Sequence, residues 1–368
     1  MHVYVHVPFC ARRCSYCDFA IAVRPTTPND AFVRTIVSEW RERTGNSALL
    51  GDEPITTLYF GGGTPSRLDP ASLSQIIVEI SSARPLAADA EVTIEANPED
   101  VTPTKATAWA LAGVNRVSLG VQSHDPAVLT WMHRTHHAEQ VPAAMAALRE
   151  AGIVNVSMDL IFGLPAALDR NWVRDLELTF ALSPTHISLY GLTIEPHTPL
   201  QHWTDRGESL PVAEENYAAE YLRANAELMR HGFEHYEVSN AALPGHRSRH
   251  NSAYWSGAEY LGLGPSAHSL LGGVRSWNVR EWAEFAERSV AGGPLQAGSE
   301  TLDPASRRLE SLYLGLRTNA GLATSRIPEE ARAAWLQAGW AEAAGERIRL
   351  TVEGWLRLDA LVGAIVHS

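Results

Sequence analysis

Residues 4–19 read Tyr-Val-His-Val-Pro-Phe-Cys-Ala-Arg-Arg-Cys-Ser-Tyr-Cys-Asp-Phe, and this stretch holds every cysteine of the chain, Cys10, Cys14 and Cys17. The spacing Cys-x3-Cys-x2-Cys places three sulfurs on one short loop, where they can face a common centre. Thiolates at this density suit soft, thiophilic metal centres. The spacing therefore predicts a metal site, and we interpret the other elements of the chain around it.

Two kinds of metal centre fit three clustered cysteines. A closed zinc site uses four protein ligands, so His2, His6 or a more distant histidine would have to complete it. A 4Fe-4S cluster usually takes four cysteines, so three leave one iron without a protein ligand and free to bind a small molecule. We favour the cluster, because His2 and His6 belong to a segment that alternates like a strand. Three unconnected buried thiols are the remaining alternative.

The composition is that of a globular protein of enzyme size. With 368 residues, 45% hydrophobic and 20% charged, the chain has room for a large domain and a small one. The formal net charge of -12 argues against a nucleic-acid partner, which needs a basic face. An odd number of cysteines in one loop makes no disulfide framework and indicates a reducing compartment. Neither a membrane-spanning run nor a signal peptide is recognised, so we predict a cytoplasmic protein.

Short apolar strands alternate with helices whose ends are marked by Pro and Gly. Helices are expected to open at Pro28, Pro70 and Pro103, each after an N-cap candidate, and to end near Gly45 and Gly113. This alternation predicts parallel strands covered by helices, in a closed or partly closed barrel of six βα units. The strands are expected at residues 3–7, 57–60, 91–95, 116–121, 154–162 and 186–192.

Polar residues and glycines collect where these strands end. In strand order they are Cys10, the glycine-rich stretch 61–66, Glu95, Gln122, Asp159, and Thr193 with Glu195. Because the carboxyl ends of the strands of a βα barrel gather on one face, where ligands bind, we expect one shared site. Taken singly, each has a structural interpretation. The glycine stretch lacks the Gly-Lys-Ser/Thr of a phosphate loop and could be a turn, and Glu95 or Asp159 could be a cap or a buried carboxylate.

The cysteine spacing, with Tyr16 directly before the last cysteine, resembles the radical S-adenosylmethionine (SAM) superfamily. In that superfamily SAM chelates the open iron, and the reduced cluster gives SAM one electron and releases a 5'-deoxyadenosyl radical. The motifs above, in their order along nearly the whole chain, resemble more narrowly the oxygen-independent coproporphyrinogen III oxidases (HemN) and their relatives, the haem chaperones (HemW). The resemblance implies an α/β fold, a partial (βα)6 radical SAM barrel.

The resemblance also implies functional residues. Cys10, Cys14 and Cys17 match the ligands of the 4Fe-4S cluster. Arg134 can pair with the carboxylate of SAM, and backbone groups of the glycines can bind the methionyl part of SAM. Carboxylate side chains can hold the ribose hydroxyls or the amine of SAM. The positions that match SAM contacts are Tyr4, Tyr16, Gly62, Gly63, Thr64, Glu95, Gln122, Arg134, Asp159 and Thr193.

The N-terminal region favours the chaperone branch of this family. The oxidases carry another cysteine two residues after the third ligand, where this chain has Phe19. They also have a long extension before the cluster loop, whereas Cys10 lies close to the start of this chain.

A second stretch, His250-Asn251-Ser252-Ala253-Tyr254-Trp255, resembles the His-Asn-x-x-Tyr-Trp motif that the chaperone branch associates with haem binding. A neutral imidazole can ligate haem iron, while the rings of Tyr254 and Trp255 can pack on the macrocycle. We therefore predict His250 as the haem ligand and keep His268 as a second candidate. A histidine buried for structural reasons is the alternative.

Near residue 302 the pattern changes to helices and one short β-like pair. This part resembles the small winged-helix-like C-terminal domain of the same family. Since its charge is mixed, we interpret it as a lid or a protein contact rather than a DNA-binding module. The expected domains are a radical SAM barrel with the haem motif over residues 1–300 and a C-terminal domain over residues 301–368.

The sequence thus predicts a radical SAM-type haem chaperone that binds a 4Fe-4S cluster, SAM and haem and delivers haem to acceptor proteins. The alternative is an oxidase that decarboxylates the propionates of coproporphyrinogen III, and a third class is an iron-sulfur protein that senses redox state. We expect no nucleic-acid partner and no transmembrane segment, while peripheral contact with a membrane stays open.

Overall fold

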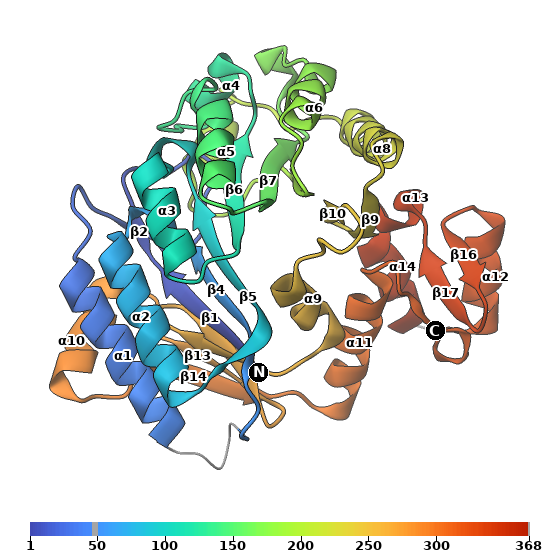
Figure 1. Cartoon of the computed structure of the whole chain (residues 1–368). Helices are drawn as coiled ribbons and strands as arrows, with labels where there is room; N and C mark the ends of the chain where they lie inside the picture. The colour runs from blue at the N-terminus through green and yellow to red at the C-terminus, as the bar shows by residue number, and fades with distance from the viewer. Residues whose placement is uncertain (46–50, 367–368) are drawn as a thin grey trace.

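The computed structural model describes residues 1–45 and 51–366, and one large sheet organises most of them (Figure 1). Its central strands are parallel, each covered by helices on its outer face. In spatial order they are β11 (Tyr260–Leu263), β1 (His2–Val7), β4 (Ile55–Gly62), β5 (Leu86–Ala96), β6 (Arg116–Gln122), β7 (Asn155–Phe162) and β8 (His186–Gly191).

The six predicted βα strands are confirmed, and they lie side by side in chain order. The prediction did not include β11, which pairs with β1 through Val3 and Leu261 and adds a seventh parallel strand. Antiparallel strands extend the sheet at both edges. Among the described residues the two outermost strands do not pair with each other, so the barrel is partial. The antiparallel strands are β12 (His268–Leu271), β13 (Val274–Asn278) and β14 (Gln296–Thr301) beyond β11, and β10 (Asn240–Ala242) and β9 (Glu234–Glu237) beyond β8.

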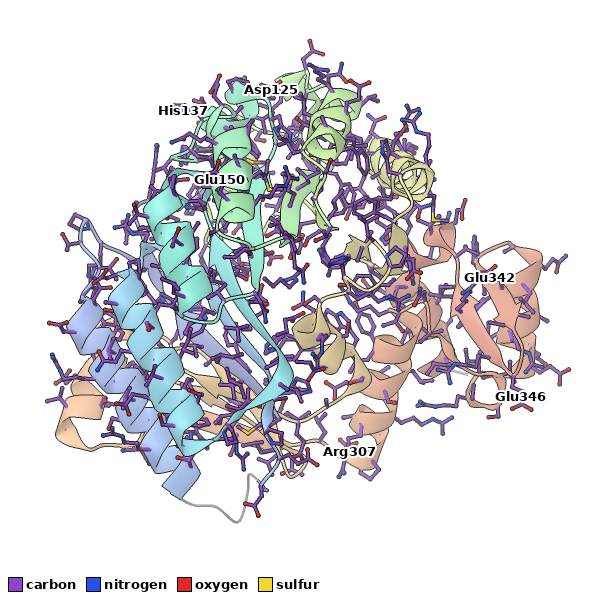
Figure 2. The ribbon with its side chains drawn as sticks, in the orientation of Figure 1. Asp125, His137, Glu150, Arg307, Glu342 and Glu346 are labelled. Atoms are coloured by element: carbon purple, nitrogen blue, oxygen red, sulfur yellow. The ribbon has the colours of Figure 1, made fainter. Side chains whose placement is uncertain are left out.

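The helices form the outer layer. Phe32, Ile36 and Trp40 of α1 (Asn29–Gly45) are fully buried, as their four-residue spacing predicts. Burying one such large apolar side chain contributes about 2 kcal/mol to stability. The others that cover the barrel are α2 (Pro70–Ala83), α3 (Pro103–Leu111), α4 (Pro126–Trp131), α5 (Gln140–Glu150), α6 (Trp172–Ala181), α8 (Glu214–Arg230) and α10 (Trp282–Ala291). Polar side chains such as Asp125, His137 and Glu150 lie over this layer (Figure 2).

A short helix, α9 (Arg249–Ser256), lies on the open side of the barrel in Figure 1. Its first turn is fixed to β5, because the Glu91 carboxylate accepts the backbone N–H groups of Arg249 and His250, both at 3.0 Å. The Ser248 hydroxyl caps the same end by accepting from Asn251 N at 3.3 Å. The predicted haem motif therefore lies on a helix held against the start of the barrel strands.

The C-terminal part carries a small antiparallel sheet and its own helices. The elements are α11 (Pro304–Leu316), β15 (Leu322–Ala323), α12 (Glu329–Gln337), β16 (Ala341–Ala344), β17 (Arg347–Leu350), α13 (Val352–Trp355) and α14 (Leu358–Val366). The predicted β-like pair is a sheet of three strands, in the order β15-β17-β16. The winged-helix-like character and the boundary at residue 300 stay predictions. Glu342 and Glu346 lie on this part in Figure 2.

Polar and aromatic contacts attach the C-terminal part to the barrel. Arg317 lies 2.9 Å from the buried carboxylate of Glu237, which belongs to β9. The Trp355 ring packs edge-on against the ring of His235 on β9, with centroids 4.9 Å apart. These contacts continue the hydrophobic core of the barrel into the C-terminal part.

Candidate functional site

The cysteine loop is anchored at both ends. Two short parallel strands, β2 (Phe9–Cys10) and β3 (Ala22–Val23), bring its start and end together. In between, Ser15 donates its backbone N–H to Met132 O at 3.1 Å and accepts from Leu200 N at 2.8 Å. Leu200 belongs to α7 (Pro199–Asp205), so segments that follow β6 and β8 hold the loop over the end of the barrel.

All three cysteines line one cavity of about 350 Å³. Donors face two of the sulfurs, since the Thr64 hydroxyl donates to Cys10 Sγ at 3.3 Å and Arg134 Nη1 donates to Cys14 Sγ at 3.6 Å. Burial raises the pKa of the Cys17 thiol to about 11, so metal binding has to displace its proton.

A single metal ion has no ready site in the part of the chain that the structure describes. No three His, Cys, Asp or Glu side chains are placed there to hold one ion. Both rings considered for zinc are engaged in hydrogen bonds, His6 with Ala20 O at 2.9 Å and Tyr4 at 3.1 Å, and His2 with Thr57 at 2.9 Å. In a 4Fe-4S cluster each cysteine binds a different iron. The cysteine sulfurs that hold a cluster therefore lie farther apart than the ligands of a single ion.

The cavity brings together nearly all the residues predicted to contact SAM. Tyr4 is the exception, because it lies outside the lining, with its hydroxyl on His6 Nδ1 and its ring beside that of Tyr59. The predicted residues in the lining are Tyr16, Gly62, Gly63, Thr64, Glu95, Gln122, Arg134, Asp159 and Thr193.

Two glycines at the end of β4 have no room for a side chain. Gly62 has φ +110°, a backbone conformation that favours glycine, and a Cβ on it would lie 2.4 Å from the His6 ring. A Cβ on Gly63 would lie 2.7 Å from the carbonyl carbon and oxygen of Pro8, two residues before Cys10. The glycine stretch is therefore a close approach of backbone to the cysteine loop.

Glu95 is a partly buried carboxylate with a partner on each oxygen. Oε1 accepts from the Tyr59 hydroxyl at 2.8 Å and Oε2 from the backbone N–H of Gly62 at 2.9 Å. Burial raises the pKa of Glu95 to about 7, although these two hydrogen bonds oppose the shift. Glu95 thus fixes the glycine stretch as well as lining the cavity.

Asp159 lies among hydroxyl groups. It accepts from the Ser118 hydroxyl on both oxygens, at 3.0 and 2.9 Å, and from Ser157 at 3.1 Å. Burial raises the pKa of Asp159, and hydrogen bonds from Ser188 and Ser118 work against that rise. The carboxylate is therefore oriented by neighbouring strands before any ligand arrives.

Arg134 is held in position from the strand ends. Its Nη2 donates to Asn97 Oδ1 at 2.6 Å and to Gly120 O at 2.9 Å, which leaves its charge beside the sulfur of Cys14. Gln122, at a register shift between β6 and β7, has a left-handed backbone with φ 66°. A non-glycine residue in this conformation is uncommon and clusters at functional sites.

Sequence reasoning missed several lining residues. Ser118 and Tyr190 line the cavity from β6 and β8, Asn97 directly follows β5, and His133 and Thr135 flank Arg134. For Asn97 and Tyr190, the position at the carboxyl end of a strand was the available signal. Serine and tyrosine are common on strands for packing reasons, so residue type alone did not mark them.

The predicted haem ligand, His250, is buried, with only 1% of its surface exposed. Its Nδ1 is 2.7 Å from the Thr57 hydroxyl and its Nε2 is 2.8 Å from the Tyr254 hydroxyl, so both ring nitrogens are occupied. The ring also stacks on Tyr59, with centroids 4.9 Å apart. Burial lowers the pKa of His250 to about 3, so the imidazole is neutral near neutral pH.

The haem motif and the cysteine cavity lie at opposite ends of the barrel strands. His250 contacts Thr57 near the start of β4, whereas Gly62 at its end lines the cavity. At about 3.3 Å per strand residue, these two points on β4 are about 16 Å apart. The assignment of His250 as haem ligand stays a prediction, and its ring would first have to lose one of its two hydroxyl partners to bind iron.

The other haem candidates are more accessible. Trp255 is partly exposed, and the Arg317 guanidinium lies 4.1 Å from its ring centroid. His268, the second candidate ligand, is exposed on β12 with its ring stacked on Trp277 at 6.0 Å.

Known proteins match this chain in sequence and in fold. Residues 4–179 match the family model of the radical SAM superfamily. The protein named "Heme chaperone HemW" from Mycobacterium tuberculosis (strain H37Rv) is 36% identical over 368 residues, covering 99% of this chain and 94% of the relative. The one of the same name from Synechocystis sp. is 36% identical over 333 residues, covering 88% and 80%.

Among solved structures, the coproporphyrinogen III oxidase HemN from Escherichia coli, described as a radical SAM enzyme, has a TM-score of 0.83 at 21% identity, covering 99% of this chain and 89% of that one. The chain therefore has the radical SAM fold and belongs to the radical SAM superfamily. Within the superfamily it belongs to the HemN/HemW group, whose members named HemW it matches over most of its length.

Membership of this superfamily implies a 4Fe-4S cluster and SAM as cofactors. Over residues 1–45 and 51–366, no helix is long and apolar enough to cross a membrane.

Proposed function

We propose that this chain is a radical SAM-type haem chaperone. It holds a 4Fe-4S cluster through Cys10, Cys14 and Cys17, binds SAM in the adjoining cavity, and binds haem for delivery to acceptor proteins. The observation that carries the proposal is the gathering of the cysteines with nine of the ten predicted SAM residues around one cavity. The names of relatives 36% identical over most of the chain support the haem part.

The side chains around the sulfurs suit a cluster. Thiolate ligands carry negative charge, and the Thr64 hydroxyl and the Arg134 guanidinium are the donors that face them. When bound, the reduced cluster supplies one electron to SAM. The chain contributes the positioning, since Asn97 and Gly120 orient Arg134 and Glu95 fixes the glycine stretch.

SAM is a zwitterion with a ribose, and the cavity offers a partner of each required kind. Arg134 suits its carboxylate, and the glycine backbone suits its methionyl part. Asp159 and Glu95 suit its amine or ribose hydroxyls as acceptors. Because both carboxylates are already hydrogen-bonded, they need little reorganisation when SAM binds.

Haem binding is assigned to the motif on α9, with His250 as axial ligand. The neutral imidazole is the form that binds iron, and burial keeps it neutral. Ligation requires the ring to exchange the hydroxyl of Tyr254 or of Thr57 for iron. Tyr254 and Trp255 then provide aromatic surface for the macrocycle.

The alternative is the oxidase activity, and Phe19 argues against it. The oxidases have a cysteine at this position, whereas here an aromatic side chain that is 58% exposed lines the cavity. This difference changes the chemistry available beside the cluster.

The test is anaerobic incubation of reconstituted protein with coproporphyrinogen III, SAM and a reductant, followed by mass spectrometry, with a parallel haem titration. The chaperone proposal expects unchanged coproporphyrinogen III and a stable Soret band. A product that has lost two carboxyl groups, without stable haem binding, would establish the oxidase instead.

A further inference from the structure

The inner face of the barrel carries a layer of polar side chains near the start of its strands. Thr57 of β4 is the register partner of Glu91 in β5. Thr93 lies two residues further along β5, on the same face, and is the register partner of Arg116 in β6. Val92, which alternates with them, belongs to the hydrophobic core. The polar residues therefore face the inside of the barrel.

Most side chains of this layer pair with one another. The Thr57 hydroxyl is 2.7 Å from His250 Nδ1. Further round the barrel, the Ser157 hydroxyl is 2.7 Å from His186 Nδ1, and His186 Nε2 is 2.8 Å from the Tyr236 hydroxyl. Buried polar groups are normally satisfied by hydrogen bonds in this way.

Arg116 is different. Only 1% of its surface is exposed, and in the part of the chain that the structure describes its Nε and Nη1 have no hydrogen-bond partner. Over the same residues, the hydroxyl of Thr93 on the neighbouring strand has none either. A buried guanidinium charge without an acceptor is costly, so this place in the barrel favours the binding of an anion.

The carboxylates of the protein do not fill this role. Glu95 and Asp159, which line the cavity above this layer, already accept from other groups. By contrast, another buried arginine, Arg170, pairs with Asp175 at 3.6 Å and with Glu220 at 2.5 Å. The donors of Arg116 are therefore available to a ligand, and a guanidinium group suits a carboxylate.

Arg116 lies between the haem motif and the cysteine cavity. The Glu91 carboxylate accepts from His250 N at 3.0 Å and fixes α9, which lies on the open side of the barrel (Figure 1). At about 3.3 Å per strand residue and about 4.8 Å between strands, the Cα atoms of Glu91 and Arg116 are about 8 Å apart. In the other direction Ser118, two residues after Arg116, lines the cavity. A ligand bound at α9 can therefore reach Arg116.

We propose that Arg116 anchors a propionate carboxylate of haem, with the Thr93 hydroxyl as a second donor. The inference rests on the proposed function, because it requires haem bound at the motif on α9. Haem carries two propionate groups, and the motif beside Arg116 is the one to which haem is assigned. The carboxylate of SAM, in contrast, has Arg134 as its proposed partner. The pairing is by charge and hydrogen bonds, with no covalent step.

The test compares haem with haem dimethyl ester, in which both propionates are uncharged, by Soret titration of anaerobically reconstituted protein. The parent should bind the ester about tenfold more weakly than haem, because a charge-assisted hydrogen bond is lost. Arg116→Gln should bind haem about as weakly as the ester and should bind both ligands alike. Arg116→Lys keeps the charge without the planar fork and should restore part of the preference for haem.

Arg170→Gln is the matched control, because it removes a buried guanidinium that is already paired with carboxylates. It should keep the preference of the parent for haem over the ester. Equal affinity of the parent for both ligands would overturn the inference, and so would an undiminished preference in Arg116→Gln.

Iron content and the SAM-dependent spectral change, recorded on the same samples, show whether each variant is folded. If Arg116→Gln is not, Thr93→Val takes its place, since it removes only the second donor. It should lower the preference about threefold, and an unchanged preference would overturn the inference. A parent that binds neither haem nor the ester would instead refute the proposed function, so the two failures are distinguishable.

Discussion

Replacing His250 by Gln tests whether the imidazole is buried and neutral, on which the account of the haem motif depends. Burial lowers the pKa of His250 from 6.5 to about 3. For a histidine with a lowered pKa, the folded state favours the neutral ring. Its stabilising contribution is therefore fully present above the unfolded pKa and is lost as pH falls from 6.5 toward 3.

The expected size follows from linkage. Each pH unit between the two pKa values is worth about 1.4 kcal/mol, so the His250 contribution should fall by about 2 kcal/mol between about pH 6.5 and pH 5. Other buried histidines share this behaviour, since burial lowers the pKa of His124 and His235 to about 4 each. They are present in both parent and variant, so the difference between the two isolates His250.

The assay is urea denaturation of cluster-free protein at about pH 7 and pH 5, with the free energy of unfolding compared between parent and His250→Gln. At pH 7 the parent should be more stable, because the variant disturbs the contacts with Thr57 and Tyr254. At pH 5 this advantage should shrink by about 2 kcal/mol. Thr57→Val, which keeps the imidazole, should retain the pH dependence of the parent. An advantage that is equal at both pH values would show that the ring titrates freely and would refute this reasoning.

Three further predictions concern the metal centres. Changing Cys10, Cys14 or Cys17 to Ala should abolish the absorbance of a cluster that otherwise contains about four iron and four sulfide, and retained zinc without iron affinity would contradict this. Gly63→Ala should destabilise the protein by about 1–3 kcal/mol and reduce iron retention, because its Cβ would lie 2.7 Å from the Pro8 carbonyl. Thermal unfolding measures the stability and iron analysis measures the retention. Unchanged stability together with unchanged iron content would refute this prediction. His250→Ala should weaken the haem Soret band while iron content stays normal. The cysteine variants should keep much of their haem affinity, because the two sites use different residues. Unchanged haem binding in His250→Ala would show that another residue is the ligand, and His268 is the next candidate.

The six barrel strands were predictable because their signals are local. Apolar runs separated by Pro-opened helices predict βα units, and Pro70 and Pro103 do begin α2 and α3. The strand β11 was not recognised, because Tyr260–Leu263 is short and contains Gly262, and its place beside β1 depends on long-range pairing. Local pattern carries no information about such a partner.

The cavity was predictable to the extent that its residues end parallel strands. Glu95, Gln122 and Asp159 were found by that rule and do line the cavity. The assignment of His250 as haem ligand stays a prediction, and the burial of its ring was not predictable, because a motif shows residue type and spacing but not burial. Both ring nitrogens of His250 contact hydroxyl groups. Thr57 belongs to a strand far away in the chain, and Tyr254 lies on the next turn of the same helix.

The central claim, one cavity that holds both the cluster and SAM, is tested most directly by the electron paramagnetic resonance spectrum of the reduced cluster with and without SAM. The account predicts that SAM changes the spectrum of the parent, because SAM binds the open iron. It also predicts that Glu95→Ala and Asp159→Ala weaken this change while iron content stays intact. If both variants respond to SAM as the parent does, or if the parent does not respond, the SAM site has been assigned to the wrong residues.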